Sequence, residues 1–318
     1  MALPRGLRNW LLGPDSDPSV RVRVFRDLLN GSADDSEVVR AQKEIGRKGW
    51  AAKILREQHP QGQWATPGTS AFELYWPKYI TTNWRLLVLS DLGVNPKHPG
   101  VAKAVELLLR RFSGPGGELG PRRGEVCIMG NAVRMMAKFG KLEDPRMRYA
   151  VDWLVRHQKQ DGGWHCFRSR TGTLDCWEAL AAFAAMPAST RTPPIQRAIE
   201  RGAEFYLERG LLRDGPTRYA PWYRLHYPVH YFYDYLVGLD VLTSLGYADE
   251  PRLRPALRRL DGRRNRDGSW NLDALQPDSE DPAYRIRGPF YPFGLEAPGH
   301  PSRWITTTAL AVLKRAGR

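Results

Sequence analysis

The residues with the clearest chemical potential lie in one stretch, residues 219–235. It contains six tyrosines, a tryptophan, a phenylalanine, two histidines and one aspartate, Asp234. Aromatic rings line pockets for apolar or cationic groups. Burial among rings favours the protonated form of a carboxyl group, as an acid catalyst needs. We therefore predict that Asp234 is a general acid and that its neighbours contact substrate: Trp222, His230, Tyr231 and Tyr233. The alternative is an aromatic plug in which Asp234 bonds a tyrosine hydroxyl.

A second group of polar side chains lies in residues 165–178. Asp175 and Glu178 are three positions apart, so they share a face if the segment is helical. Glu178 stands among apolar residues, where a carboxylate must face a partner or a polar cavity. We predict that this pair contributes acid chemistry, with a helix cap as the alternative role of Asp175.

Three cysteines, Cys127, Cys166 and Cys176, are the only ones in the chain. They are too few for a disulfide framework. All three lie near the expected starts of two adjacent apolar helices, and three thiolates would suit zinc. Zinc is thus an open cofactor prediction, and no other cofactor is expected. The alternative is three reduced, half-buried thiols.

Further candidate substrate contacts open other apolar helices. Lys78, Tyr79 and Trp84 flank one helix start, and Asn131 shares a helix face with Cys127. Arg303 and Trp304 open the last helix. Arg303 could bind a carboxylate or phosphate, or pair with Glu296 or Asp281.

The elements that must position these residues repeat along the chain. The sequence of residues 158–164, QKQDGGW, recurs as QHPQGQW at 58–64 and RNRDGSW at 264–270, with weaker copies at 116–119 and 214–217. Asp and Gly favour a tight turn, and the Trp can pack on the preceding helix while its indole N–H bonds a neighbouring repeat. A period of roughly fifty residues is typical of repeated helical pairs. Amphipathic patterns predict outer helices, and nearly uniform apolar patterns predict inner ones. The outer helices are expected at 101–112, 148–160, 195–211 and 253–260, and the inner ones at 20–29, 80–92, 126–139, 174–186, 231–245 and 305–313.

The pattern Q-x-x-D-G-x-W, complete at Gln158, Asp161, Gly162 and Trp164, resembles the QW repeat of squalene and hopene cyclases and protein prenyltransferase β subunits. The resemblance covers roughly residues 41–317. It implies an all-α fold, an α/α toroid of five to six inner and outer hairpins. Residues 1–318 would form one domain, with residues 1–40 as closing helices. It also implies an active site inside the ring, at the N-terminal ends of inner helices.

The resemblance extends only partly to the chemistry of these families. Prenyltransferases hold zinc on an Asp, a Cys and a His, which would correspond here to Asp175, Cys176 and His230. The spacing between Asp175 and Cys176 differs from that pattern. The D-x-D-D acid motif of the cyclases is absent, and no D-D-x-x-D diphosphate motif lies on an expected inner helix.

Composition limits the partners that we expect. The formal net charge is +14, but the arginines are spread along the chain and no nucleic-acid motif is present, so we expect no nucleic acid. No apolar run could cross a bilayer and no signal peptide is evident, so the expected location is cytoplasmic. Peripheral membrane contact stays open, and no obligate partner is identified.

We therefore predict an enzyme with cyclase-like acid and cation chemistry on a small apolar or prenyl-type substrate in an aromatic funnel. One alternative is a zinc-dependent transferase or hydrolase that uses the Cys, His and Asp residues. Another is a non-catalytic ring that binds a lipid or a partner. A glycan-acting α/α barrel is a weaker alternative.

Overall fold

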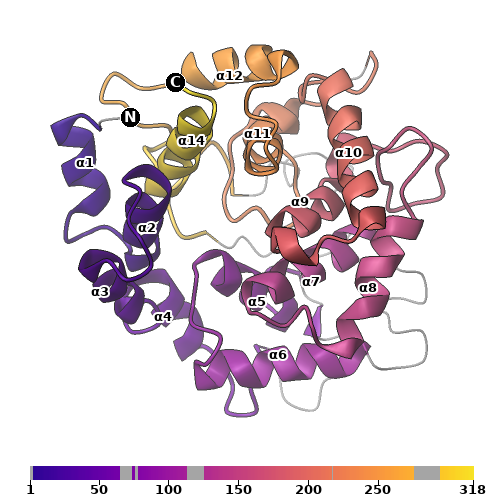
Figure 1. The fold of residues 1–318 in the computed structure, drawn as a ribbon. Coiled ribbons are helices and arrows are strands. Elements are labelled where there is room, and N and C mark those ends of the chain that lie inside the picture. Colours follow the sequence, from indigo (N-terminus) through magenta and orange to yellow (C-terminus); the bar gives the residue numbers. More distant parts are fainter. Residues whose placement is uncertain (1–2, 65–73, 76–77, 113–124, 217, 276–293) are drawn as a thin grey trace.

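The computed structural model describes residues 3–318 except 65–73, 76–77, 113–124, 217 and 276–293. Within those residues all regular elements are helical, and the extended pairings are isolated bridges. The helices form a ring of inner and outer members (Figure 1). The predicted all-α toroid of five to six hairpins is confirmed. The weak repeat copy at 116–119 and Asp281, a suggested partner of Arg303, lie outside the described residues, as does Thr217 at the end of the other weak copy.

The inner helices are almost wholly buried. In α5, for example, every residue from Thr82 to Ser90 is buried. Neighbouring inner helices pack against one another, α7 on α5 and α9, and α14 on α11 and α2. The inner helices are α2 (Pro18–Arg23), continued by the π-helix η1 (Val24–Leu28), α5 (Thr82–Asp91), α7 (Val126–Lys138), α9 (Glu178–Ala185), α11 (Tyr235–Ser244) and α14 (Arg303–Arg315).

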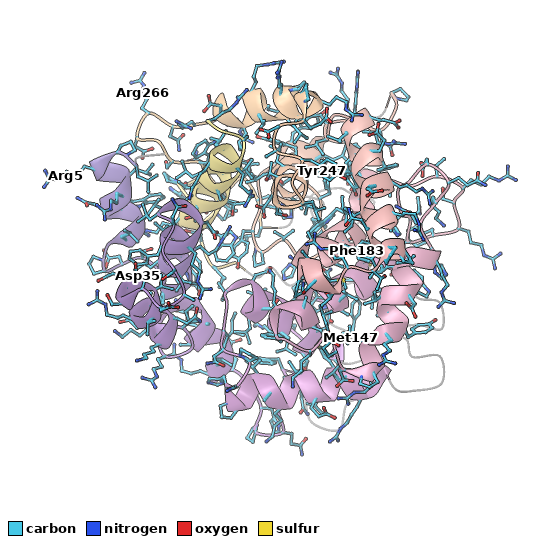
Figure 2. The ribbon with its side chains drawn as sticks, viewed as in Figure 1. Arg5, Asp35, Met147, Phe183, Tyr247 and Arg266 are labelled. Carbon is cyan, nitrogen blue, oxygen red and sulfur yellow. The ribbon has the colours of Figure 1, made fainter. Side chains whose placement is uncertain are left out.

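The outer helices bury one face and expose the other, as their mixed sequences predict. Figure 2 shows the same division for single side chains: Arg5 and Arg266 extend outward, whereas Phe183 of α9 lies in the interior and is fully buried. The helix α3 (Ser36–Glu44) follows η1 and precedes α4 along the chain. The outer helices are α1 (Arg5–Leu12), α4 (Gly49–Arg56), α6 (Pro99–Phe112), α8 (Pro145–Arg156), α10 (Pro193–Glu208) and α12 (Arg254–Asp261).

The repeated turns link each outer helix to the next repeat. Gly162 has φ +87, as the predicted tight turn requires. The Trp164 indole N–H donates to the Leu154 carbonyl of its own repeat, 2.8 Å away. The link to the neighbouring repeat comes from Gln158, whose amide donates to the Gly162 and Ala198 carbonyls at 2.7 and 2.8 Å. The prediction that the indole N–H bonds the neighbouring repeat was wrong, because that N–H points to its own outer helix, while the far edge of the ring packs against Gly202 of α10.

The same pattern occurs in the first and third copies. Trp64 and Trp270 donate to the carbonyls of Ile54 and Leu260, each 2.7 Å away. Gln58 bridges to the Gly100 carbonyl at the start of α6. In the third copy Arg264 replaces the glutamine, and its guanidinium lies over the Trp270 ring instead. The sequence repeat is therefore a repeated structural joint.

Two inner helices begin later than predicted. The element expected at 231–245 is helical only from Tyr235, because the Asp234 side chain accepts from the Val237 N–H and caps the helix there. The element expected at 174–186 begins as the 3₁₀ turn η3 (Leu174–Cys176), and α9 starts at Glu178. The residues before both helices are thereby free to form loops at the floor of the ring.

The N-terminal helices lie beside the last inner helix. The Lys314 ammonium donates to the carbonyls of Asp27 and Leu28 at 2.8 and 3.1 Å. Arg23 donates to the Thr308 hydroxyl at 2.9 Å. These bonds join the two ends of the described chain around the ring. Within the described residues, no helix is both long and apolar enough to cross a membrane.

Candidate functional site

A half-open cavity of about 260 Å³ lies between the inner helices of the ring. Its floor comes from the aromatic stretch 219–235 together with Trp177 and Trp304, and its upper wall from the C-terminal halves of inner helices. Two of the predicted site residues, Asp234 and Trp304, line it. The resemblance implied a site at the N-terminal ends of the inner helices. The cavity begins there but also extends along the C-terminal halves of these helices.

Asp234 and His226 form a buried pair on the cavity wall. The Asp234 carboxylate lies 2.6 Å from His226 Nδ1 and also accepts from the His226 backbone N–H at 3.1 Å. Its other oxygen accepts from the Val237 N–H at 2.9 Å. The two oxygens offer about four acceptor positions, so three are used and one remains in the tautomer whose Nδ1 carries the proton. Asp234 is 1% exposed. The predicted alternative, a bond to a tyrosine hydroxyl, is replaced by the histidine.

Aromatic rings surround this pair. The Tyr227 and Trp304 rings stack with centroids 4.2 Å apart, and Trp177 lies on the same cavity. The Tyr227 hydroxyl is buried and has no hydrogen-bond partner in the described part of the chain. Burial raises the pKa of Tyr227 well above its usual value, so the hydroxyl keeps its proton. It can donate to a polar group inside the cavity.

Charged side chains form the upper wall of the cavity. Asp91 lies 3.3 Å from Arg134 and 2.5 Å from Lys138. Arg23 and Asp240 also line the cavity. Together with Asp234, the lining contains three cationic and three acidic side chains, so its formal charge is zero with Asp234 ionised and +1 with Asp234 protonated. A charge this small favours an uncharged ligand over a polyanion.

A second aromatic cluster gathers several predicted contacts away from the cavity. The Lys78 ammonium lies 4.6 Å from the centre of the Tyr231 ring, and the hydroxyls of Tyr79 and Tyr231 lie 3.0 Å apart. The rings of Trp84 and His230 also meet, with centroids 5.4 Å apart. Burial lowers the pKa of His230 to about 3, so it stays neutral. None of these five residues lines the cavity.

The remaining predicted contacts bond other parts of the protein. The Asn131 amide donates to the His230 carbonyl at 2.9 Å, and the Tyr233 hydroxyl donates to the Leu211 carbonyl at 3.0 Å. The Trp222 indole donates to Asp175 at 2.6 Å. The Arg303 guanidinium donates to the Trp10 carbonyl and lies over the Trp10 ring. These groups stabilise the floor and the ring, and the structure does not place them on the cavity.

The predicted Asp175 and Glu178 pair is not brought together on one face. Asp175 is exposed in η3, whereas Glu178 is fully buried at the first turn of α9. The prediction assumed that both residues lie in one α-helix, but Asp175 lies in η3 and α9 begins only at Glu178. Neither Glu178 oxygen has a hydrogen-bond partner among the described residues. Burial therefore raises the pKa of Glu178 well above its usual value.

The cysteines do come together. The thiols of Cys166 and Cys176 lie 3.7 Å apart, and Cys127 lies 3.7 Å from a Glu125 oxygen. Asp175, Cys176 and His230, which correspond to the prenyltransferase zinc ligands, do not form a group with ligand atoms within 4.8 Å of one another in the described chain. Glu125 was not predicted as a member of this cluster, although it lies only two residues before Cys127.

Sequence reasoning missed the cavity residues that lie far from helix starts. Arg134 and Lys138 stand near the end of α7 and Asp91 at the end of α5. Their signal was present, because charged residues on a nearly apolar inner helix must face a partner or a cavity. His226, Tyr227 and Trp177 were within the stretches singled out, but were not chosen from them.

No family model matches this chain, and no curated protein gives a significant match. Among solved structures, a polysaccharide lyase matches at 12% identity and a TM-score of 0.51, over 95% of this chain and 90% of the lyase. A protein from Actinoplanes matches at 17% identity and a TM-score of 0.48, over 99% and 98%. The type II terpene cyclase MstE from Scytonema matches at 16% identity and a TM-score of 0.33, over 84% and 95%. The likeness to the lyase shows the fold alone, and the other two are too weak to support fold or function.

Proposed function

We propose that this protein is an enzyme that protonates a small, uncharged prenyl or polyene substrate in the cavity, as cyclases do. The observation that carries the proposal is the buried Asp234–His226 pair on the wall of an aromatic cavity. Asp234 is the proposed proton donor. The fourth acceptor position of its carboxyl group is where the transferable proton would reside.

His226 supports this role as a positioning residue. Its backbone and ring nitrogens both face one Asp234 oxygen. Donors aimed at that oxygen stabilise the carboxylate that proton transfer leaves behind. The ring faces of Tyr227 and Trp177 would then stabilise the carbocation that protonation creates. The Tyr227 hydroxyl would bond a polar end of the substrate.

The size and charge of the cavity narrow the substrate class. At about 260 Å³ it lies just below the range of roughly 300–1,000 Å³ typical of drug-sized ligands. A chain the size of geranyl or farnesyl is therefore favoured over squalene. With Asp234 protonated, as a proton donor must be, the lining has three cations and two carboxylates, a formal charge of +1. This charge is too small to neutralise a diphosphate, so an uncharged alcohol or polyene is favoured.

The first test is turnover of a panel of prenyl alcohols, prenyl diphosphates and squalene, followed by gas chromatography and mass spectrometry. Wild type should cyclise a short uncharged member. Asp234→Asn should lower the rate by about 10²–10⁴-fold, the usual contribution of a general acid. Asn caps a helix about as well as Asp, so α11 should remain folded.

The matched control is Asp144→Asn, the same change at the cap of outer helix α8. It should leave turnover unchanged. The proposal fails if Asp234→Asn, folded by circular dichroism, turns over at the wild-type rate. It also fails if wild type binds the panel without forming any product, as a non-catalytic ring would.

A further inference from the structure

A cluster of sulfur and oxygen ligands lies at the start of α7, at the other end of that helix from the cavity charges. We call Glu125, Cys127, Cys166 and Cys176 the thiol cluster. Cys127 and Lys138 are eleven residues apart on α7, or about 16 Å along the helix axis. The thiol cluster is thus separate from the upper wall of the cavity, and the proposed acid chemistry does not use it.

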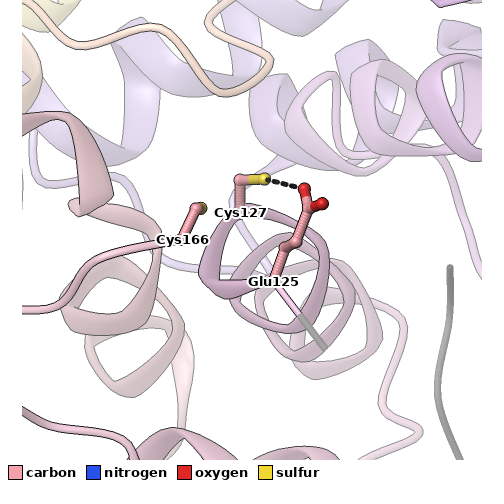
Figure 3. A group of neighbouring side chains, drawn as sticks. All are labelled: Glu125, Cys127 and Cys166. Carbon is pink, nitrogen blue, oxygen red and sulfur yellow. Dashed lines mark hydrogen bonds between the residues drawn. The ribbon is translucent and has the colours of Figure 1, made fainter. Parts of the chain in front are cut away.

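The members of the cluster come from three segments of the chain. Glu125 and Cys127 stand at the start of α7, Cys166 on the loop after the repeated turn, and Cys176 in η3. Figure 3 shows Cys127 and Glu125 beside Cys166 on the adjacent segment. The ligand atoms of these three residues all lie within 4.8 Å of one another. The Cys176 thiol lies 3.7 Å from Cys166 and is buried.

These separations agree with the edges of a metal tetrahedron. Zinc binds thiolates at about 2.3 Å, so two sulfurs of one tetrahedral site are about 3.8 Å apart. The Cys166–Cys176 distance is 3.7 Å. A carboxylate oxygen at about 2.0–2.2 Å from zinc gives a slightly shorter oxygen–sulfur edge, and the Glu125–Cys127 distance is 3.7 Å. Cys176 is outside the group whose ligand atoms all lie within 4.8 Å of one another, so its side chain would have to turn toward Cys127 and Glu125 to complete the tetrahedron.

The chemistry of these four side chains favours a particular class of metal. A cysteine binds metal as its thiolate. Thiolates select soft or borderline metals, and a carboxylate in the same set favours zinc over copper(I).

We infer that the thiol cluster is a structural zinc site, with Cys127, Cys166, Cys176 and Glu125 as its four ligands. Four protein ligands leave no open position, as in sites that stabilise a fold. The ion would tie the start of α7 to the loop and to η3, which precede the neighbouring inner helix. This set differs from the Asp, Cys and His that the prenyltransferase resemblance implies.

The test is zinc content and cobalt spectroscopy of the full chain. Protein purified from zinc-supplemented medium should contain one zinc per chain by mass spectrometry of metals. Replacement by cobalt should give the visible bands of a tetrahedral ion with thiolate ligands. Removal of zinc with a chelator should lower the Tm, and zinc alone should restore it.

Cys166→Ser and Glu125→Gln should lose or weaken zinc binding, whereas Glu143→Gln, an exposed glutamate elsewhere, should retain it. If Cys166→Ser does not fold, the cobalt spectrum of wild type still decides the question. Substoichiometric zinc that these changes do not affect would overturn the inference. So would an octahedral cobalt spectrum, or a Cys166–Cys176 disulfide in freshly purified, metal-free protein.

Discussion

At the scale of single residues, Asp91 is the acidic centre of the upper cavity wall. Its side chain is 7% exposed and that of Arg134 is 9% exposed, so their attraction is little screened by solvent. Burial alone would raise the pKa of Asp91. Arg134 and Lys138 outweigh it and hold that pKa below its usual value. The folded protein therefore favours the carboxylate.

Replacing Asp91 by Asn should destabilise the protein by about 3 kcal/mol at pH 7, because it leaves buried Arg134 without its partner. A lowered folded pKa adds stability above the unfolded value of about 3.9 and loses it as pH falls. The difference between wild type and Asp91→Asn, measured by denaturant unfolding, should therefore shrink below about pH 4. Glu37→Gln, which breaks an exposed pair with Arg40, should cost less than about 1 kcal/mol. An Asp91→Asn protein as stable as wild type would contradict the assignment.

Part of the candidate site was predictable at this scale. Asp234 was found because a lone acid among rings is conspicuous in sequence. Its partner His226 could not be distinguished from His230, because only the folded loop shows which of the two histidines faces the Asp234 carboxylate. The cysteines were found by residue type, but Glu125 was missed because glutamate is common at exposed helix starts.

At the scale of elements, the inner helices α7 and α9 approach each other closely at Gly130. A Cβ added there would lie 2.5–2.7 Å from the backbone and Cβ of Glu178. Gly130, which has no Cβ, therefore lets α7 and α9 approach closely. That approach also seals Glu178 from solvent.

Gly130→Ala should destabilise the protein by about 1–3 kcal/mol, because α7 and α9 must separate. Gly6→Ala is the matched control, since α1 has open space at that position. It should be neutral or stabilise by up to about 1 kcal/mol through helix propensity. Both values come from denaturant midpoints. Equal effects of the two changes would show that helix contact at Gly130 is not the cause.

The helices themselves were largely predictable, since apolar periodicity reports burial directly. Their starts were less so. Asp234 and η3 delay α11 and α9 by a few residues, and side-chain capping of this kind depends on a loop conformation that periodicity does not encode. The repeated turns predicted that successive repeats are linked at these positions. The repeat in sequence could not show whether the Trp164 indole N–H or the Gln158 amide bonds the next repeat.

At the scale of the whole molecule, the ring provides a place for chemistry without selecting the reaction. One fold commonly serves unrelated reactions, so the function must be argued from the cavity. Here the Asp234–His226 pair, aromatic rings and nearly balanced charges meet in one half-open cavity. The central claim is that reaction begins when Asp234 donates a proton to the substrate.

The most direct test of that claim is the mass of the product formed in D₂O. If Asp234 is the proton donor, the proton that it transfers is replaced from solvent, so protonation of a carbon–carbon double bond should add one deuterium to each product molecule. Ionisation of a diphosphate would begin without this proton. We predict cyclic product with one deuterium at carbon, formed about 10²–10⁴-fold more slowly by Asp234→Asn. Cyclic product without deuterium, or labelled product from Asp234→Asn at the wild-type rate, would contradict it.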